Sequence, residues 1–167
     1  PMDCPNLASR LSWDWISGNK LQAGNWQVFE WLSGSTLQTW LAEHNHVLDA
    51  QQAVQLMLPI CNAVAYLHSN DTPIIHKHIG PASIGLWRDQ EGLLHTFLRD
   101  YGMSHIPQPL QMSSVAALRA EGRGAPEQFN GTDRSDAQTD IYAIGATLYQ
   151  LVTGYPPACG EDRLSHH

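Results

Sequence analysis

Histidine and cysteine are the side chains of this 167-residue chain that are best suited to bind a metal ion. Two pairs of its nine histidines, His44/His46 and His76/His78, have one residue between their members. Neither pair has a nearby third ligand, although a zinc site is built from several such ligands. The three cysteines are far apart, odd in number and in no CxxC pair, which argues against a disulfide framework or a cysteine-based zinc site. We therefore predict ordinary histidines rather than a zinc centre.

A second group of residues has the chemistry for proton transfer and for binding a hard cation. The segment 76–83 reads His-Lys-His-Ile-Gly-Pro-Ala-Ser and joins two imidazoles, a lysine and turn-forming residues. Imidazole can accept a proton near neutral pH, so this segment has the means for acid–base chemistry. Asp100-Tyr101-Gly102, Ala125-Pro126-Glu127 and Asp140 follow it in the sequence. Each short pattern alone is weak evidence for a functional site, and the order of the patterns along the chain is more informative than any one of them.

The composition limits the class of protein and its partners. Hydrophobic residues make up 43% of the chain and charged residues 15%, which excludes a disordered tail. The formal net charge of −7 argues against nucleic acid or an anionic membrane as the main partner. No apolar run approaches the length of a membrane span, and residues 1–5 lack the pattern of a signal peptide. We expect a soluble, cytoplasmic protein without membrane insertion.

The N-terminal quarter has the pattern of a β-hairpin followed by a short helix. Leu11, Trp13 and Trp15 alternate with polar residues, turn-forming residues follow, and 26–32 has the pattern of the returning strand. Residues 33–35 break that strand, and 36–41 start a helix with Leu37, Trp40 and Leu41 on one side.

The rest of the chain alternates helical and strand-like patterns. Asp49 can cap a helix that runs to about residue 69 and contains Pro59, which should kink or thin it. Strands are predicted at 84–87 and 93–98, and a long loop at 103–124. A final helix, from about residue 139 to 153, ends at Gly154 as a C-cap. The spacing of apolar residues predicts the buried faces of the two long helices: Val54, Met57, Leu58, Cys61, Val64, Ala65 and Leu67 on the first, and Ile141, Ile144, Leu148, Leu151 and Val152 on the second.

This order of elements and motifs resembles the large lobe of a protein kinase, in the style of bacterial Ser/Thr kinases. His76-Lys77-His78-Ile79-Gly80-Pro81-Ala82-Ser83 is in register with the catalytic loop, and the motifs at residues 100–102 and 125–127 match D-F-G and A-P-E. Asp140 begins the segment that is similar to the central helix. The resemblance implies an α+β fold, a partial kinase-like domain over 1–167: the last small-lobe strands and hinge at 1–32, and a mainly helical large lobe at 33–167, truncated after the central helix.

The resemblance also implies roles for individual residues. In the catalytic loop, His78 stands at the position of the base, Gly80 at that of a phosphate-contacting lysine, and Ser83 at that of a metal-binding asparagine. Asp100 keeps the identity of a metal ligand. The remaining implied sites are the hinge backbone and the adenine floor, at Glu30, Leu32 and Gly85. Residues with structural roles are His76, Tyr101, Glu127 and Asp140.

His78, Gly80 and Ser83 depart from the residues that the family has at these positions. Three functions are consistent with these departures. The first is a pseudokinase-like signalling or protein-interaction module that lacks phosphotransfer activity. The second is a weak ATP-dependent Ser/Thr protein kinase that uses His78 as its base, and the third is a non-functional fragment of a kinase domain. No cofactor is firmly implied, although weak binding of ATP and Mg²⁺ is left open. We expect a protein partner, and association through an apolar surface that includes Trp13, Trp15 and Trp26. Ala120 and Arg123 stand where the family has a threonine and an aromatic residue, which argues against docking of a peptide substrate.

Overall fold

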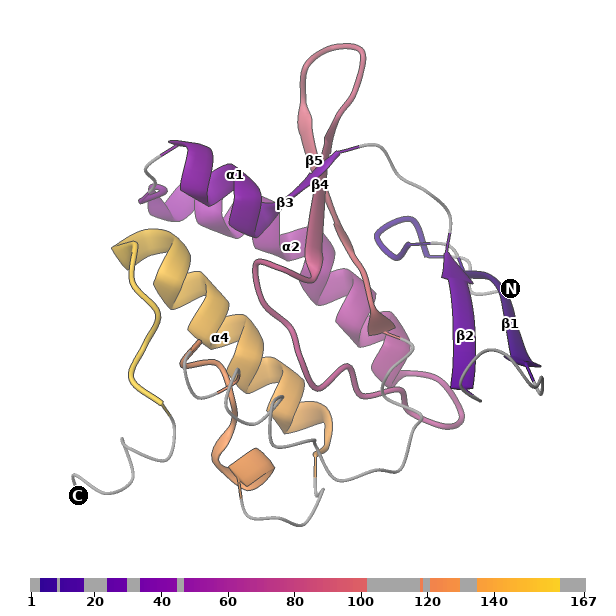
Figure 1. Ribbon diagram of the computed structural model, residues 1–167. Helices are drawn as coiled ribbons and strands as arrows, with labels where there is room; N and C mark the ends of the chain where they lie inside the picture. Colours follow the sequence, from indigo (N-terminus) through magenta and orange to yellow (C-terminus); the bar gives the residue numbers. More distant parts are fainter. Residues whose placement is uncertain are drawn as a thin grey trace.

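The computed structural model describes residues 4–8, 10–16, 24–29, 34–44, 47–101, 118, 121–129 and 135–159 (Figure 1). Two long helices, α2 (Ala50–His68) and α4 (Ala137–Thr153), lie side by side and contact each other. A shorter helix, α1 (Leu37–His44), precedes them, with Leu37 fully buried. The predicted helices are confirmed, and α2 continues without interruption through Pro59.

Both long helices begin with a capping box, which explains where they start. Asp49 accepts a hydrogen bond from the Gln52 backbone N–H at 2.8 Å, and the Gln52 side chain accepts one from the Asp49 N–H. Asp136 and Thr139 form the same arrangement at α4. Gly154 ends α4 in a left-handed conformation at φ +78°, as predicted.

The cap of α2 supplies a test of the local stability of this helix. Replacing Asp49 with alanine removes an acceptor for an orphan N–H, so we expect the free energy of unfolding to fall by about 1 kcal/mol in urea denaturation. Gln51→Ala, on the exposed surface of the same first turn, is the control and should change this free energy by less than about 0.5 kcal/mol. Equal effects of the two substitutions would contradict the capping role of Asp49.

The predicted buried faces of the long helices are partly wrong. Exposed fractions of 55% at Val54, 57% at Leu58 and 59% at Ile141 show that these side chains face outward, and Val152 is also exposed. Small and polar residues are buried instead, because the two helices approach each other closely and α2 also packs on β5. The buried set on these helices is Ala53, Leu56, Met57, Ile60, Ala63, Val64, Leu67, Thr139, Asp140, Ala143, Ile144, Ala146, Thr147 and Leu151.

A small antiparallel sheet lies against α2. Its strand order is β3 (Ser35–Thr36), β4 (Ile84–Arg88), β5 (Leu94–Leu98), so residue 35, predicted as a break, belongs to a two-residue strand. The hydroxyl of Thr96 donates a hydrogen bond of 2.7 Å to the Leu56 carbonyl, which places one face of the sheet on α2. Gly85 pairs with Phe97 in the register of β4 and β5, and alternation along the strands puts both on the opposite face.

The predicted N-terminal hairpin is confirmed as a separate two-stranded sheet of β1 (Arg10–Ile16) and β2 (Gly24–Phe29), which lies to one side of the helices (Figure 1). Residues 4–8 connect it to the core, because the Ala8 N–H donates to the Leu98 carbonyl and the Leu98 N–H donates to the Asn6 carbonyl. The tryptophan side chains of this hairpin and residues 30–33, including the hinge positions Glu30 and Leu32, lie outside what the structure describes. So does most of the predicted loop 103–124. Among the described helices, none has the length and apolarity to cross a membrane.

Candidate active site

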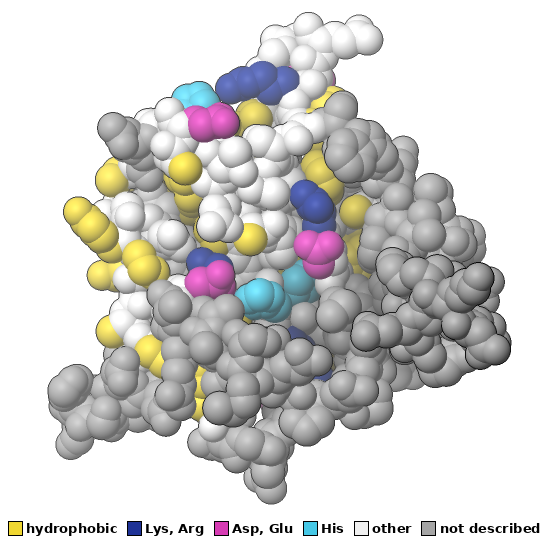
Figure 2. Space-filling model, viewed as in Figure 1, with side chains coloured by type: hydrophobic (Ala, Val, Ile, Leu, Met, Phe, Trp, Pro, Cys, Tyr) yellow, Lys and Arg dark blue, Asp and Glu magenta, His cyan; other side chains and the backbone are white. Residues whose placement is uncertain are grey.

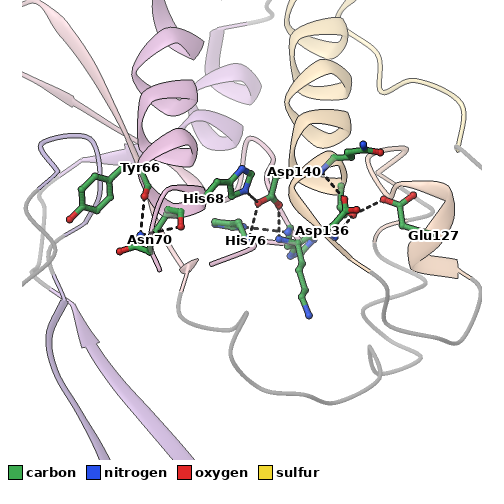
Figure 3. Close-up of polar contacts among 12 residues, drawn as sticks. Tyr66, His68, Asn70, His76, Glu127, Asp136 and Asp140 are labelled. Atoms are coloured by element: carbon green, nitrogen blue, oxygen red, sulfur yellow. Dashed lines mark hydrogen bonds and ion pairs between the residues drawn. The ribbon is translucent and has the colours of Figure 1, made fainter. Parts of the chain in front are cut away.

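Asp140 holds the loop that follows α2 in place against α4. Its carboxylate is fully buried and accepts three hydrogen bonds of 2.8 Å, from the His68 imidazole and from the backbone N–H groups of His76 and Lys77 (Figure 3). Lys77 has φ +68°, a left-handed conformation that costs free energy for a residue with a side chain. The contacts from Asp140 hold the backbone in this conformation, so the structural role predicted for Asp140 has a direct geometric basis.

His76 connects this loop to the end of β5. Its side chain is buried, Nε2 donates to the Arg99 carbonyl at 2.7 Å, and Nδ1 accepts a longer bond of 3.3 Å from the His78 N–H. This pattern assigns the proton to Nε2. Burial lowers the pKa of the His76 imidazole, while the Arg99 carbonyl and the Asp140 charge act in the opposite direction. The buried Tyr101 hydroxyl donates to the Ala8 carbonyl at 2.8 Å.

The lowered pKa of His76 predicts a pH dependence of stability. Below about 6.5, the ordinary value of histidine, the unfolded imidazole binds a proton that the folded one resists. This contribution to stability is present above that pH and is lost as the pH falls towards the folded pKa. In NMR titrations, we expect the His76 ring signals, assigned by their absence in His76→Gln, to change at a pH below about 6.5. A midpoint at or above that value would contradict the prediction.

His78 lies beside an ion pair. Its ring is half exposed, and Nε2 is 3.4 Å from a carboxylate oxygen of Glu121. The same oxygen pairs with the Arg123 guanidinium, which also donates to the Gln150 side chain at 3.1 Å. The hydrogen bond from His78 is the largest cause that lowers the pKa of Glu121, and the Arg123 charge lowers it further. The candidate base therefore faces a carboxylate of its own chain.

Ser83, the predicted metal ligand, uses its hydroxyl within the loop. The hydroxyl accepts a hydrogen bond from the Gly80 N–H and donates one to the Gly80 carbonyl, both at 3.0 Å, and the residue is buried. Asp100 differs, since it is exposed and has φ +62°. Lys77 and Asp100 are the two non-glycine residues with positive φ in the described part of the chain. Of the two predicted metal ligands, Ser83 is buried and its hydroxyl is hydrogen-bonded within the loop, whereas the carboxylate of Asp100 belongs to an exposed residue.

The space around Gly80 and Gly85, the two glycines predicted at altered site positions, is filled by other side chains. A Cβ atom built on Gly80 would lie 2.2 Å from Nε of Arg123, and one built on Gly85 would lie 2.2 Å from the ring of Phe97. Both large side chains are buried. Gly85 stands where the resemblance implies the adenine floor, and the Phe97 ring packs against this glycine.

The segment that contains the A-P-E motif is tied to the same loop. The Gln128 side chain donates to the Lys77 carbonyl at 2.8 Å and accepts from the Ala125 N–H at 2.9 Å. Glu127 accepts a bond of 2.5 Å from the Thr139 hydroxyl at the start of α4 (Figure 3). Gln128 and His68 were not predicted as site residues, because neither belongs to one of the motifs. A cavity of about 570 Å³ adjoins this segment, lined by Gln38, Leu41, Ala42, Val47, Pro81, Glu121, Arg123, Gln150, Thr153, Gly154, Tyr155 and Pro156.

The loop that follows α2, the end of β5 and the start of α4 thus form a single polar site. Figure 2 shows histidine, acidic and basic side chains gathered near the middle of one face. No group of three or more metal-ligating side chains is found in the part of the chain that the structure describes.

Compared with known families, residues 20–167 match the sequence model of the protein kinase domain. The chain belongs to the protein kinase domain family.

Kinases from bacteria and animals are similar to this kinase domain. The serine/threonine-protein kinase PknB of Mycobacterium leprae is 29% identical over 140 residues, which cover 83% of this chain and 21% of that protein. A probable PknB of Corynebacterium glutamicum is 31% identical over 138 residues (81% and 20%), and the serine/threonine-protein kinase TNNI3K of Mus musculus is 28% identical over 148 residues (84% and 17%). The chain thus spans about a fifth of the length of the curated relatives it matches.

A solved structure supports the fold. The crystal structure of a double mutant of the Mycobacterium tuberculosis PknI kinase domain superposes with a TM-score of 0.65 at 21% identity, covering 92% of this chain and 53% of that one. The predicted α+β kinase fold is confirmed. Within it, the structure brings His76, His78, Gly80, Ser83 and Asp140 together in one loop and its support.

Proposed function

We propose that this kinase domain is a pseudokinase-like signalling or protein-interaction module without phosphotransfer activity. The observation that carries the proposal is the closed hydrogen-bond pair between the Ser83 hydroxyl and the Gly80 backbone. A hydroxyl used for both donation and acceptance inside a buried turn is a poor ligand for Mg²⁺, which requires nearly ideal octahedral geometry. Phosphoryl transfer depends on placing charges around the phosphate, and this loop offers few of them.

The position of the base supports the same proposal. The His78 Nε2 atom is beside the Glu121 carboxylate, so a substrate hydroxyl would have to displace that contact before its proton could be taken. Gly80 supplies no cation, and the nearest guanidinium, that of Arg123, is paired with Glu121. Each lost polar group at a site of developing charge typically costs about 10²–10³ in rate, and such losses do not simply add.

A weak Ser/Thr protein kinase is the second candidate, and one observation favours it. The loop that carries His78 is rigidly held by Asp140, and the exposed Asp100 carboxylate could bind one Mg²⁺ ion. In that reaction His78 would accept the hydroxyl proton of the substrate while the phosphoryl group moves from ATP.

Radiolabelled phosphate transfer from ATP to generic protein substrates and to the chain itself tests these alternatives. We expect no transfer above a no-protein control, and no rise in melting temperature when ATP and Mg²⁺ are added together. Transfer that disappears in His78→Ala, or a metal-dependent rise in Tm that disappears in Asp100→Ala, would overturn the proposal. The first result would establish the weak kinase, and the second would make it the leading candidate.

The proposed partner is another protein, in the cytoplasm. Large apolar side chains are exposed on the described surface of the long helices, among them Leu58, Ile141 and Tyr149. Such a surface favours association with a protein. Light scattering of the purified chain over a wide concentration range should show dimers or larger species, and a monodisperse monomer throughout would argue against association through this surface.

A further inference from the structure

Two glycines of the kinase domain stand where the resemblance implies functional side chains, and both are packed against a large side chain from another segment. Gly80 contacts Arg123, which comes from the segment before the A-P-E motif. Gly85 in β4 contacts Phe97 in β5. Arg123 and Phe97 are each 5% exposed. Protein interiors are densely packed, so an alanine at either glycine requires its neighbour to move.

We infer that Arg123 and Phe97 are internal replacements for the side chains that glycine removes at positions 80 and 85. Arg123 fills the position of the catalytic-loop lysine, and Phe97 fills the position of the adenine floor. The inference deepens the proposed function, on which it rests, because it states what occupies the nucleotide-facing positions of the module. The two side chains that are replaced are those with which a kinase-like site binds a nucleoside triphosphate: a cation for phosphate and an apolar floor for a purine.

Arg123 is held in this position by contacts from three directions. One Nη atom pairs with Glu121, the other donates to Gln150 in α4, and Nε faces Gly80 without a hydrogen-bond partner among the described residues. A guanidinium nitrogen left unpaired in a buried position indicates that packing on the glycine, rather than hydrogen bonding, decides where this part of the side chain lies. Because Glu121 neutralises the charge, Arg123 fills the lysine position without offering a free cation.

Phe97 is held by the sheet. It is directly opposite Gly85 in the antiparallel register, and three of its ring carbons lie within 2.6 Å of the position of an added Cβ. A buried ring that lies across the neighbouring strand on one face of the sheet has little room to move, whereas an arginine side chain can swing away at the cost of its hydrogen bonds. We therefore expect the Gly85–Phe97 pair to tolerate change less than the Gly80–Arg123 pair.

A double-mutant cycle on the 167-residue chain tests the packing. Gly80→Ala should lower the melting temperature by about 4–8 °C when Arg123 is present, and by less than about 1 °C in an Arg123→Ser background. Gly145→Ala is the matched control, since a Cβ there meets no atom of the described residues within 4 Å and should leave the Tm unchanged or raise it. The same design applies to Gly85→Ala in a Phe97→Leu background, with a larger effect. Equal losses in both backgrounds would overturn the inference.

The cycle also covers the case in which a single variant does not fold. If Gly80→Ala is unfolded, the double variant with Arg123→Ser should still fold. If the double variant fails to fold while Arg123→Ser alone is folded, Arg123 is not what fills the space at Gly80, and the inference is wrong. None of these measurements depends on phosphotransfer, so the inference can fail while the proposed function stands.

Nucleotide binding tests the functional meaning of Arg123. A lysine placed at Gly80 has no room while Arg123 occupies the site, so Gly80→Lys alone should not bind ATP with Mg²⁺ more tightly than the unmodified chain. The double variant Gly80→Lys/Arg123→Ser should bind at least about tenfold more tightly than Arg123→Ser, since a charge-assisted contact to phosphate is restored. Calorimetry that shows the same gain in Gly80→Lys alone, or no gain in the double variant, would overturn the inference for this pair.

Discussion

Replacing Asp140 with alanine is expected to lower the free energy of unfolding by about 3–5 kcal/mol, the range seen when one partner of a buried charge network is removed. The substitution leaves the buried N–H groups of His76 and Lys77 without acceptors, and each unsatisfied buried group costs about 1–3 kcal/mol. It also removes the partner of the His68 imidazole. Urea denaturation, followed by far-ultraviolet circular dichroism, measures the effect.

Two further variants separate the role of the Asp140 hydrogen bonds from that of its charge. Asp140→Asn keeps the shape and one oxygen acceptor, so we expect its loss to be smaller than that of the alanine variant. Asp71→Ala removes an exposed carboxylate near the other end of the same loop and should change the free energy of unfolding by less than about 0.5 kcal/mol. A loss below about 1 kcal/mol in Asp140→Ala would mean that the loop does not depend on this network.

Gly122→Ala is expected to lower the free energy of unfolding by about 2–5 kcal/mol, as the sum of backbone strain and a steric clash. Gly122 has φ +63°, and an added Cβ would lie 1.9 Å from the Pro157 carbonyl oxygen. Since that oxygen belongs to the backbone, the clash cannot be relieved by a rotamer change. The turn between Glu121 and Arg123 would have to move, and with it the contact of Glu121 with His78. Urea denaturation gives the free energy.

A second glycine separates strain from clash. Gly92 also has a left-handed backbone, at φ +84°, but in the described part of the chain no atom lies within 4 Å of an added Cβ. Gly92→Ala should therefore cost only the strain, about 1–2 kcal/mol. Equal losses at the two positions would show that the contact with Pro157 does not constrain the segment.

Local sequence signals predicted the elements well, because each depends on a few neighbouring residues. Asp49 and Gly154 marked helix ends through hydrogen bonds and backbone conformations that are local to the chain. The order of motifs predicted the kinase fold and gave structural roles to His76 and Asp140, which the structure places in contact. Helix faces were less predictable, since the close approach of α2 and α4 buries alanine and threonine and leaves Val54 and Ile141 exposed.

The packing of other side chains into the space beside Gly80 and Gly85 could not be predicted from the sequence. Gly80 and Gly85 were identified as departures from the family pattern, and from the sequence alone a glycine appears only as a missing side chain. Whether the space is empty depends on side chains from other segments, here Arg123 and Phe97. Neither belongs to the catalytic loop, and only the three-dimensional packing relates them to it.

The contacts of Asp140 have a consequence for the order in which the chain folds. Its three hydrogen bonds join residues that are 63, 64 and 72 positions apart. Such bonds require a long loop to close first, and the entropy of closure is not repaid until many distant groups meet. The capped helices α2 and α4 depend on local contacts and can form earlier. We expect the candidate active site to become ordered late in folding, after the helices that support it have docked.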